Sequence, residues 1–254
     1  MPTTFQAPEI RLALNTVQTF HQKRRLLQGI ESSPSVLVAV PYITALDTFD
    51  CRNWMLDSGA YTVFKSGKTI DLDWYIGFAL EQQNGPRPPV EIVALDVIGD
   101  GPASLRNAES MAAAGVKNLV PVFHAGEDWQ LLKAYCAEFP KVGIARGALG
   151  YHASKLALSW VERVFALCWP HRFHSFGWVS EKLLMRYPFE TADSSSWEFG
   201  PTRYGQGWKL GGQATRLSWK GSCQNLACQV NYYLRFEALL RARWAKEMRT
   251  LEVK

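Results

Sequence analysis

Short apolar runs alternate with longer segments of helical spacing along most of this 254-residue chain, and this alternation limits the possible folds more than any other feature. A β-branched run that ends in polar or glycine residues, followed by a helical segment, is typical of a βαβ unit with parallel strands. The seven runs lie at 35–43, 53–59, 91–100, 118–126, 141–150, 171–178 and 188–197. Helices are expected at 103–115, 127–139, 154–168, 180–187 and 224–249.

The spacing of these runs, roughly 20–35 residues, predicts repeated βαβ units, and eight such units in about 250 residues is the size of a (β/α)8 TIM barrel. We place the eighth strand at 207–212, although this run is the least regular of the set. The prediction is therefore an α/β fold, a compact TIM barrel that forms a single domain over 1–254. An open doubly wound sheet is the alternative, but no G-x-G-x-x-G motif follows the early strands.

Composition excludes several classes of protein. The chain is 47% hydrophobic and contains 10 Trp, so it has enough apolar surface for a sizeable core and does not match a disordered protein. Its 5 Cys form no framework of a small secreted domain. The N-terminus lacks the pattern of a signal peptide, and the longest uncharged apolar stretch, 34–46, is too short to span a bilayer. We expect a soluble cytoplasmic protein with no membrane partner.

The charge distribution points to a polyanionic partner. Residues 1–200 carry 18 Lys and Arg against 20 Asp and Glu, whereas residues 201–254 carry 10 against 3. Clustered basic residues attract phosphates regardless of sequence, so the basic C-terminal segment (about 201–254) predicts nucleic-acid binding. A solvated basic face without a ligand is the alternative.

Three aspartates stand where predicted strands end, which is where a TIM barrel carries its chemistry. These are Asp57, Asp96 and Asp193. Carboxylates gathered in a partly dry pocket oppose one another's ionisation, which is how acids and nucleophiles are tuned. Each could instead cap the helix that follows it, as Asp often does. Because all three occupy equivalent positions, we favour a functional site.

The motifs at these strand ends resemble those of the tRNA-guanine transglycosylases, which are TIM barrels. DSGAYT (57–62) is similar to that family's DSGG(F/Y)Q segment, and VALDVIGD (93–100) to its next Asp-bearing strand end. PVFHAG (121–126) stands in place of a Gln-Gly-Gly stretch, IARGALG (144–150) resembles the Gly-Gly-Leu loop, and ETADSSSW (190–197) the strand of the nucleophilic Asp. The resemblance covers about 54–197. The shorter chain looks closest to the phage and bacterial DpdA-like DNA 7-deazaguanine transglycosylases.

This resemblance implies an enzyme, a glycosyltransferase that exchanges guanine in DNA for a free 7-deazaguanine base such as preQ0. The product would be a hypermodified DNA protected against restriction, made in the cytoplasm, or in the host cytoplasm for a phage-encoded enzyme. The resemblance implies no cofactor. The alternatives are a shortened tRNA-guanine transglycosylase and a barrel that binds nucleic acid without catalysis.

The resemblance also assigns roles to residues. Asp193 would be the nucleophile that attacks C1′ and forms a covalent glycosyl intermediate, and Asp57 would be the general acid/base. Asp96 would accept hydrogen bonds from the base, and Tyr61 and Phe176 would stack on it. The residues expected to bind the base are Asp96, Tyr61, His124, Gly147, Phe176 and Ser58.

Two residues in the matched motifs, His124 and Arg146, depart from the family pattern. His124 replaces a Gln; it can still hydrogen-bond the base, and a purely structural role is the alternative. Arg146 replaces a small residue, and either reaches a phosphate or pairs with a site carboxylate. The family's zinc cluster also lacks counterparts, because only Cys223 and Cys228 follow Asp193 and two thiols do not complete a zinc site. We therefore expect no metal and no zinc subdomain.

DNA binding is then expected from the basic C-terminal segment, whose Gly-rich and aromatic stretch suits phosphate contacts and base stacking. Trp208 and Trp219 could equally be core residues, the commoner fate of Trp. With Arg146, the residues predicted to contact nucleic acid are Arg203, Lys209, Lys220, Arg241, Arg243 and Lys246.

Overall fold

The computed structural model describes residues 8–14, 29–47, 49–147, 154–201, 206–211, 213–216 and 223–252. The chain divides into two compact units. One, the terminal unit, comprises residues 1–38, 42–52 and 177–254; the other, the central unit, comprises residues 39–41 and 53–176. The prediction of a single domain over 1–254 stays a prediction.

Parallel strands form the centre of the central unit. β3 (Trp54–Asp57) pairs with β4 (Glu91–Val93), which pairs with β5 (Leu119–Val120). β6 (Val122–His124) pairs with β7 (Lys141–Ala145), which pairs with β8 (Arg172–Ser175). Only Pro121 separates β5 from β6, and its carbonyl accepts a hydrogen bond from the Gly143 N–H at 2.8 Å. β5 and β6 are therefore one strand, interrupted where proline has no N–H to donate.

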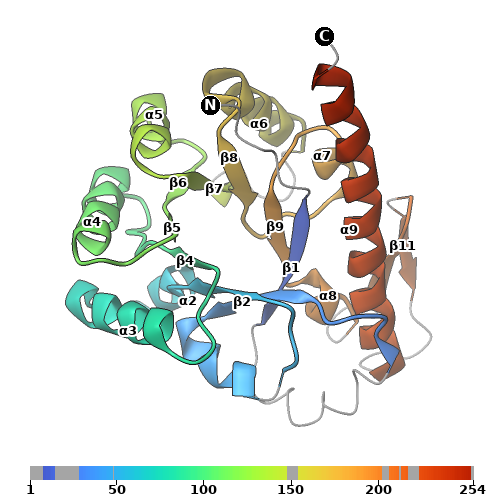
Figure 1. The fold of residues 1–254 in the computed structure, drawn as a ribbon, viewed down its shortest axis with the longest axis horizontal. Coiled ribbons are helices and arrows are strands. Elements are labelled where there is room, and N and C mark those ends of the chain that lie inside the picture. The colour runs from blue at the N-terminus through green and yellow to red at the C-terminus, as the bar shows by residue number, and fades with distance from the viewer. Residues whose placement is uncertain are drawn as a thin grey trace. The chain divides into compact units, whose positions relative to one another are not determined.

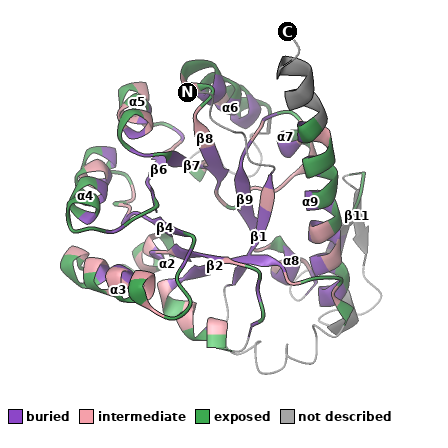
Figure 2. Ribbon diagram, in the orientation of Figure 1, coloured by how far each residue is buried: buried purple, intermediate pink, exposed green. Residues whose placement is uncertain are grey.

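Helices connect these strands. Figure 1 shows α3, α4 and α5 around the outside of β3–β6, and in Figure 2 the strands are buried while the outer helix faces are exposed. Asp71, Asp100 and Asp128 cap α3, α4 and α5, each accepting a hydrogen bond from a first-turn backbone N–H. The helices of the central unit are α2 (Ala60–Lys65), α3 (Leu72–Asn84), α4 (Gly101–Ala113), α5 (Trp129–Glu138) and α6 (Ser154–Cys168).

Aromatic side chains fill the space between the strands and helices of the central unit. Phe123 on β6 is fully buried and lies against Trp129 of α5 and Trp160 of α6, with ring centroids 5.7 and 5.8 Å away. Because side chains alternate along a strand, Val122 and His124 point to the opposite face of β6 from Phe123. The aromatic packing thus fixes which face of the strand carries His124.

In the terminal unit, β1 (Glu9–Leu14) lies between β2 (Ser35–Ala39) and β9 (Thr191–Ser194), parallel to both. β10 (Gln206–Lys209) and β11 (Gln213–Arg216) form a separate antiparallel pair. The short elements are η2 (Val40–Asp47), α7 (Glu181–Leu184) and α8 (Ser196–Phe199), and the final helix is α9 (Cys223–Glu252).

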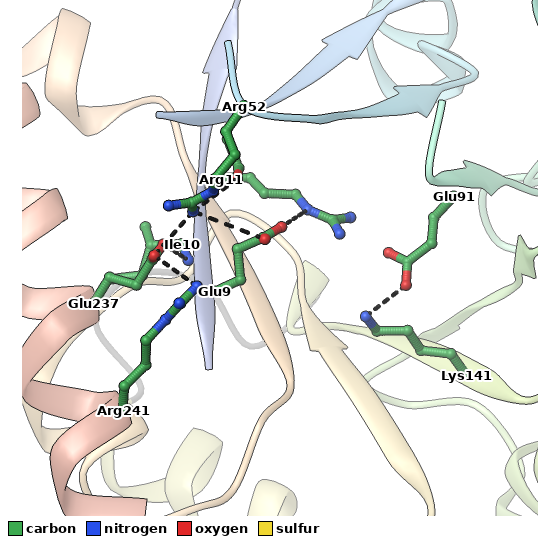
Figure 3. A network of polar contacts seen from close by, with 9 residues as sticks. Glu9, Ile10, Arg11, Arg52, Glu91, Lys141, Glu237 and Arg241 are labelled. Carbon is green, nitrogen blue, oxygen red and sulfur yellow. Dashed lines mark hydrogen bonds and ion pairs between the residues drawn. The ribbon is translucent and has the colours of Figure 1, made fainter. Parts of the chain in front are cut away.

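A buried carboxylate attaches α9 to the first strand. Glu237 is 4% exposed and accepts hydrogen bonds from the Ile10 N–H and from Arg52, each at 2.9 Å, while Arg241 pairs with it at 2.9 Å (Figure 3). In the central unit, Lys141 at the start of β7 donates to Glu91 at the start of β4 at 2.8 Å. Both sets of contacts lie at the amino ends of strands, the end that supports stability in a TIM barrel.

The strand predictions are confirmed with one exception. All seven apolar runs contain a parallel strand, with 118–126 containing both β5 and β6. The eighth assignment, 207–212, was wrong: it contains most of β10, which pairs only with β11 in an antiparallel ladder. The remaining parallel strand is β1, which the sequence pattern did not indicate. Counted with β5 and β6 as one, the described residues include eight parallel strands.

Candidate functional site at the carboxyl ends of the strands

None of the three strand-end aspartates is the cap of the helix that follows it. The N-cap of α2 is Gly59, that of α4 is Asp100 and that of α8 is Ser195. Gly59 has φ +75, and a Cβ there would lie 2.9 Å from Cδ of Pro41, so glycine is required directly after Asp57 and Ser58. The capping alternative for Asp57, Asp96 and Asp193 is therefore wrong.

Asp96 and His124 form a close pair in the central unit. His124 Nε2 lies 2.6 Å from Asp96 Oδ2, and the Ser104 hydroxyl on α4 donates to Asp96 Oδ1 at 2.9 Å. The Asp96 and His124 side chains are 7% and 21% exposed. Ser104 also accepts from the Val97 N–H at 2.9 Å, which fixes the hydroxyl itself. Both oxygens of Asp96 thus have defined partners, one of them the imidazole.

Glu127 is a third member of this cluster, and the sequence pattern did not indicate it. Its carboxylate accepts the backbone N–H of His124 at 2.7 Å. Burial raises the pKa of Glu127, against the lowering effect of that backbone hydrogen bond and of His124. Its position directly before Asp128, the cap of α5, marks it as part of a helix start, and nothing in the sequence signals a contact with His124.

Gly147 lies beside the imidazole. Its φ is +25, and a Cβ at this position would be 3.5 Å from Nδ1 of His124. Gly147 is exposed and the preceding Arg146 is half-buried. The structure therefore brings together Asp96, His124 and Gly147, three of the residues that the sequence predicted to bind a base.

Phe176 covers a glycine of the neighbouring strand. Gly143 on β7 is paired in register with His174 on β8, and a Cβ at Gly143 would lie 2.1 Å from Cε2 of Phe176. The rings of Phe176 and His174 are edge-on, with centroids 4.3 Å apart. Phe176 is half-buried while its ring rests on the strand.

The residues after β3 differ in exposure. Ser58 is 1% exposed, and its hydroxyl accepts the Ala60 N–H at 3.3 Å, so it shapes the turn. Tyr61 is 61% exposed, with the Lys65 ammonium 4.4 Å from its ring centroid. Asp57 is half-buried at the end of β3. Burial of Tyr75 raises the pKa of that phenol, and the negative charge of Asp57 raises it further.

Asp193 belongs to the terminal unit, where it is 5% exposed at the end of β9. Its Oδ1 accepts the backbone N–H of Gly177 at 2.8 Å. Next to it, the Ser194 hydroxyl lies 3.4 Å from the hydroxyl of Tyr233 on α9, and burial raises the pKa of Tyr233 to about 12. Tyr233 lies in the helix predicted at 224–249, and the sequence pattern did not mark it as a site residue.

The basic C-terminal residues fall into three groups. Arg203 and Lys220 lie outside the described residues, as does the side chain of Lys246 on α9. Lys209 is exposed, and Arg241 is 44% exposed while paired with Glu237. Arg243 donates to the carbonyl of Met185 at 2.6 Å and lies over the ring of Trp244. These contacts give Arg243 a structural role in packing α9.

No group of three potential metal ligands occurs among the residues that the structure describes. No helix within the described part of the chain is long and apolar enough to span a membrane.

No protein-family model and no curated protein matches the chain. A search of solved structures finds similarity to a protein from Coccidioides immitis, provisionally described as a fructose-1,6-biphosphate aldolase. The TM-score is 0.50 at 13% identity, and the match covers 94% of this chain and 88% of the other. With the eight parallel strands, this similarity confirms the predicted α/β TIM-barrel fold and excludes the open doubly wound sheet. At this identity it establishes the fold alone.

Proposed function

We propose that this protein is a base-exchange transglycosylase that replaces guanine in DNA with a 7-deazaguanine. The observation that carries the proposal is the set of strand-end aspartates, Asp57, Asp96 and Asp193. None of them caps the following helix, and a TIM barrel carries its catalytic residues at the carboxyl ends of its strands. The ordered motif resemblance over about 54–197 supplies the reaction class.

In the proposed mechanism, a carboxylate oxygen of Asp193 attacks C1′ of the target nucleotide. The C1′–N9 bond breaks, its electron pair leaves with guanine, and a covalent glycosyl-enzyme intermediate remains. The 2.8 Å hydrogen bond from the Gly177 N–H orients the Asp193 carboxylate without neutralising it. Asp57 gives a proton to the leaving guanine and then takes the N9 proton of the incoming 7-deazaguanine, whose N9 bonds to C1′ as the bond from Asp193 to C1′ breaks and its electron pair returns to the carboxylate.

The recognition of the base is assigned to the central unit. Asp96 and His124 present hydrogen-bonding groups at the end of their strands, and Gly147 adds no side chain beside them. Phe176 and Tyr61 offer ring faces for stacking, worth about 1–3 kcal/mol per base. In the structure Lys65 lies over one face of Tyr61, so a base stacks on the other face or displaces the ammonium.

Base exchange can be measured directly with labelled nucleic acid. Duplex DNA, single-stranded DNA and tRNA, each carrying radiolabelled guanine, are incubated with the protein and 7-deazaguanine, and released guanine is counted. We expect release from DNA that depends on the added base. Release from tRNA alone would identify a shortened tRNA enzyme, and binding of DNA without release from any polymer would identify a non-catalytic barrel.

A further inference from the structure

The ring of His124 is oriented by its neighbours at one nitrogen only. Nε2 lies 2.6 Å from Asp96, whose other oxygen is held by Ser104, so the carboxylate cannot rotate away without losing a second hydrogen bond. The backbone N–H of His124 is bound to Glu127 at 2.7 Å. Side chain and backbone are thus both fixed, which is what a pre-organised ligand contact requires.

The other ring nitrogen, Nδ1, has no hydrogen-bond partner among the described residues. Gly147 lies close to it, since a Cβ at that position would be 3.5 Å from Nδ1. Because residue 147 has no side chain, the space in front of Nδ1 is not filled by it. Among the described residues, none therefore holds Nδ1 of His124 in a hydrogen bond.

The surroundings of His124 favour its charged form. Burial opposes the charge, but the hydrogen bond and the negative charge of Asp96, together with the charge of Glu127, outweigh it and raise the His124 pKa above its usual 6.5. These two carboxylates come from the segments after β4 and β6, and the third ionisable group nearby is Tyr135 of α5, whose own pKa burial raises. With Nε2–H held by Asp96, the imidazolium has its second proton on Nδ1.

We infer that His124, as an imidazolium held by Asp96, donates a hydrogen bond from Nδ1 to the oxo group of the purine and stabilises the negative charge that this base carries as it leaves. This inference rests on the proposed function. As Asp193 bonds to C1′, the electron pair of the C1′–N9 bond moves into the purine and part of its charge reaches the oxo oxygen. Asp57 still supplies the proton that neutralises the base, so His124 needs to lose none.

A charged donor acts differently from an amide at the same position. An amide binds the ground state and the departing anion with similar strength, whereas a positive charge binds the anion more strongly, and only such differential binding accelerates the chemical step. The acceleration is present below the His124 pKa and disappears as pH rises through it. Replacing His124 by Gln should therefore lower kcat more than it raises KM.

The test compares His124→Gln with the wild type and with His171→Gln as a matched control. His171 precedes β8, at the amino end of that strand, and burial lowers its pKa. Exchange is measured between about pH 5.5 and 9, a range that brackets the ordinary titration of histidine, and the titration of the His124 ring is followed by NMR. We expect wild-type kcat to fall about tenfold or more above the His124 pKa. His124→Gln should have a kcat about tenfold or more below the wild-type value at lower pH and show no such fall, while His171→Gln keeps the wild-type profile.

Two results separate this inference from the proposed function. Wild-type exchange combined with an unchanged kcat and pH profile in His124→Gln would overturn the inference and leave the proposed function standing. No exchange by the wild type on any polymer would overturn the proposed function. It would also end the role of His124 in stabilising the leaving base, and the hydrogen bond from Nδ1 to the oxo group would then be decided by calorimetric binding of free guanine. That hydrogen bond requires weaker binding above the His124 pKa in the wild type but not in His124→Gln, and pH-independent or absent binding refutes it.

Discussion

Gly143→Ala should push Phe176 off the strand on which it rests. The new Cβ would lie 2.1 Å from Cε2 and 2.7 Å from Cδ2 of Phe176, both far inside the closest distance that real Cβ contacts reach. The Phe176 ring is also edge-on to His174, whose side chain is fully buried, so the ring cannot simply move toward β8. Either the ring rotates outward or the two strands are strained.

The expected cost follows from this geometry. Overpacking of a well-packed site costs about 1–3 kcal/mol. For a chain of this size each kcal/mol lowers Tm by about 2–4 °C, so the decrease should be roughly 2–12 °C. If Phe176 stacks on the base, its displacement also removes about 1–3 kcal/mol of binding free energy, which is about 5- to 150-fold in affinity.

A double-mutant cycle measures the effect. Gly143→Ala, Phe176→Ala and the double variant are compared by denaturant unfolding and by calorimetric binding of 7-deazaguanine. Without the ring there is nothing for the methyl group to strike, so in the Phe176→Ala background Gly143→Ala should cost less than about 0.5 kcal/mol. Equal costs in both backgrounds would show that the Gly143 position and the Phe176 ring are not in contact.

Three further predictions concern the nucleophile, the basic helix and the buried ion pair. Asp193→Asn should abolish exchange and leave DNA affinity within a few-fold, because it removes a covalent step; turnover near the wild-type rate would contradict the assignment. Neutralising Arg241 and Lys246 together should weaken DNA binding at every sequence and reduce the slope of log affinity against log salt by roughly 0.7–0.9 for each phosphate that is no longer neutralised; an unchanged slope would mean that the basic face is only solvated. Lys141→Met should cost about 3–5 kcal/mol in urea unfolding because it leaves Glu91 buried without its 2.8 Å partner, and a cost below about 1 kcal/mol would contradict this.

Much of the fold could be predicted because apolar strands and helical spacing are local features. The strand β1 was not predicted because its first residues include Glu9 and Arg11, and charged residues normally indicate a surface segment. In the structure Arg11 is 3% exposed and donates to Glu9 at 3.0 Å, so its charge is satisfied inside the fold. The run at 207–212 has strand composition, but a short glycine-containing turn between two runs is typical of an antiparallel hairpin, and Gly211, with φ +98, lies between β10 and β11.

The candidate site was predictable in part for the same reason. The positions of Asp96, His124 and Gly147 follow from their places at strand ends, which a parallel sheet brings to one edge. Their hydrogen-bond partners could not be predicted from the sequence. Glu127, for example, accepts the His124 N–H across a turn whose shape the sequence does not specify. The hydrogen bond between the Ile10 N–H and Glu237 joins residues 227 positions apart, which no local pattern predicts. The same carboxylate also binds Arg241, so the sequence could not show that Arg241 already has an ion-pair partner.

Identification of the residue that carries the sugar is the sharpest test of a covalent transglycosylase mechanism. DNA with labelled guanine is mixed with the protein in the absence of an incoming base, the reaction is stopped by acid, and the adduct is digested and sequenced by mass spectrometry. We expect a deoxyribosyl group on the peptide that contains Asp193, and its absence in Asp193→Asn. Exchange that proceeds with the adduct on another residue, or with no adduct at all, would contradict that mechanism.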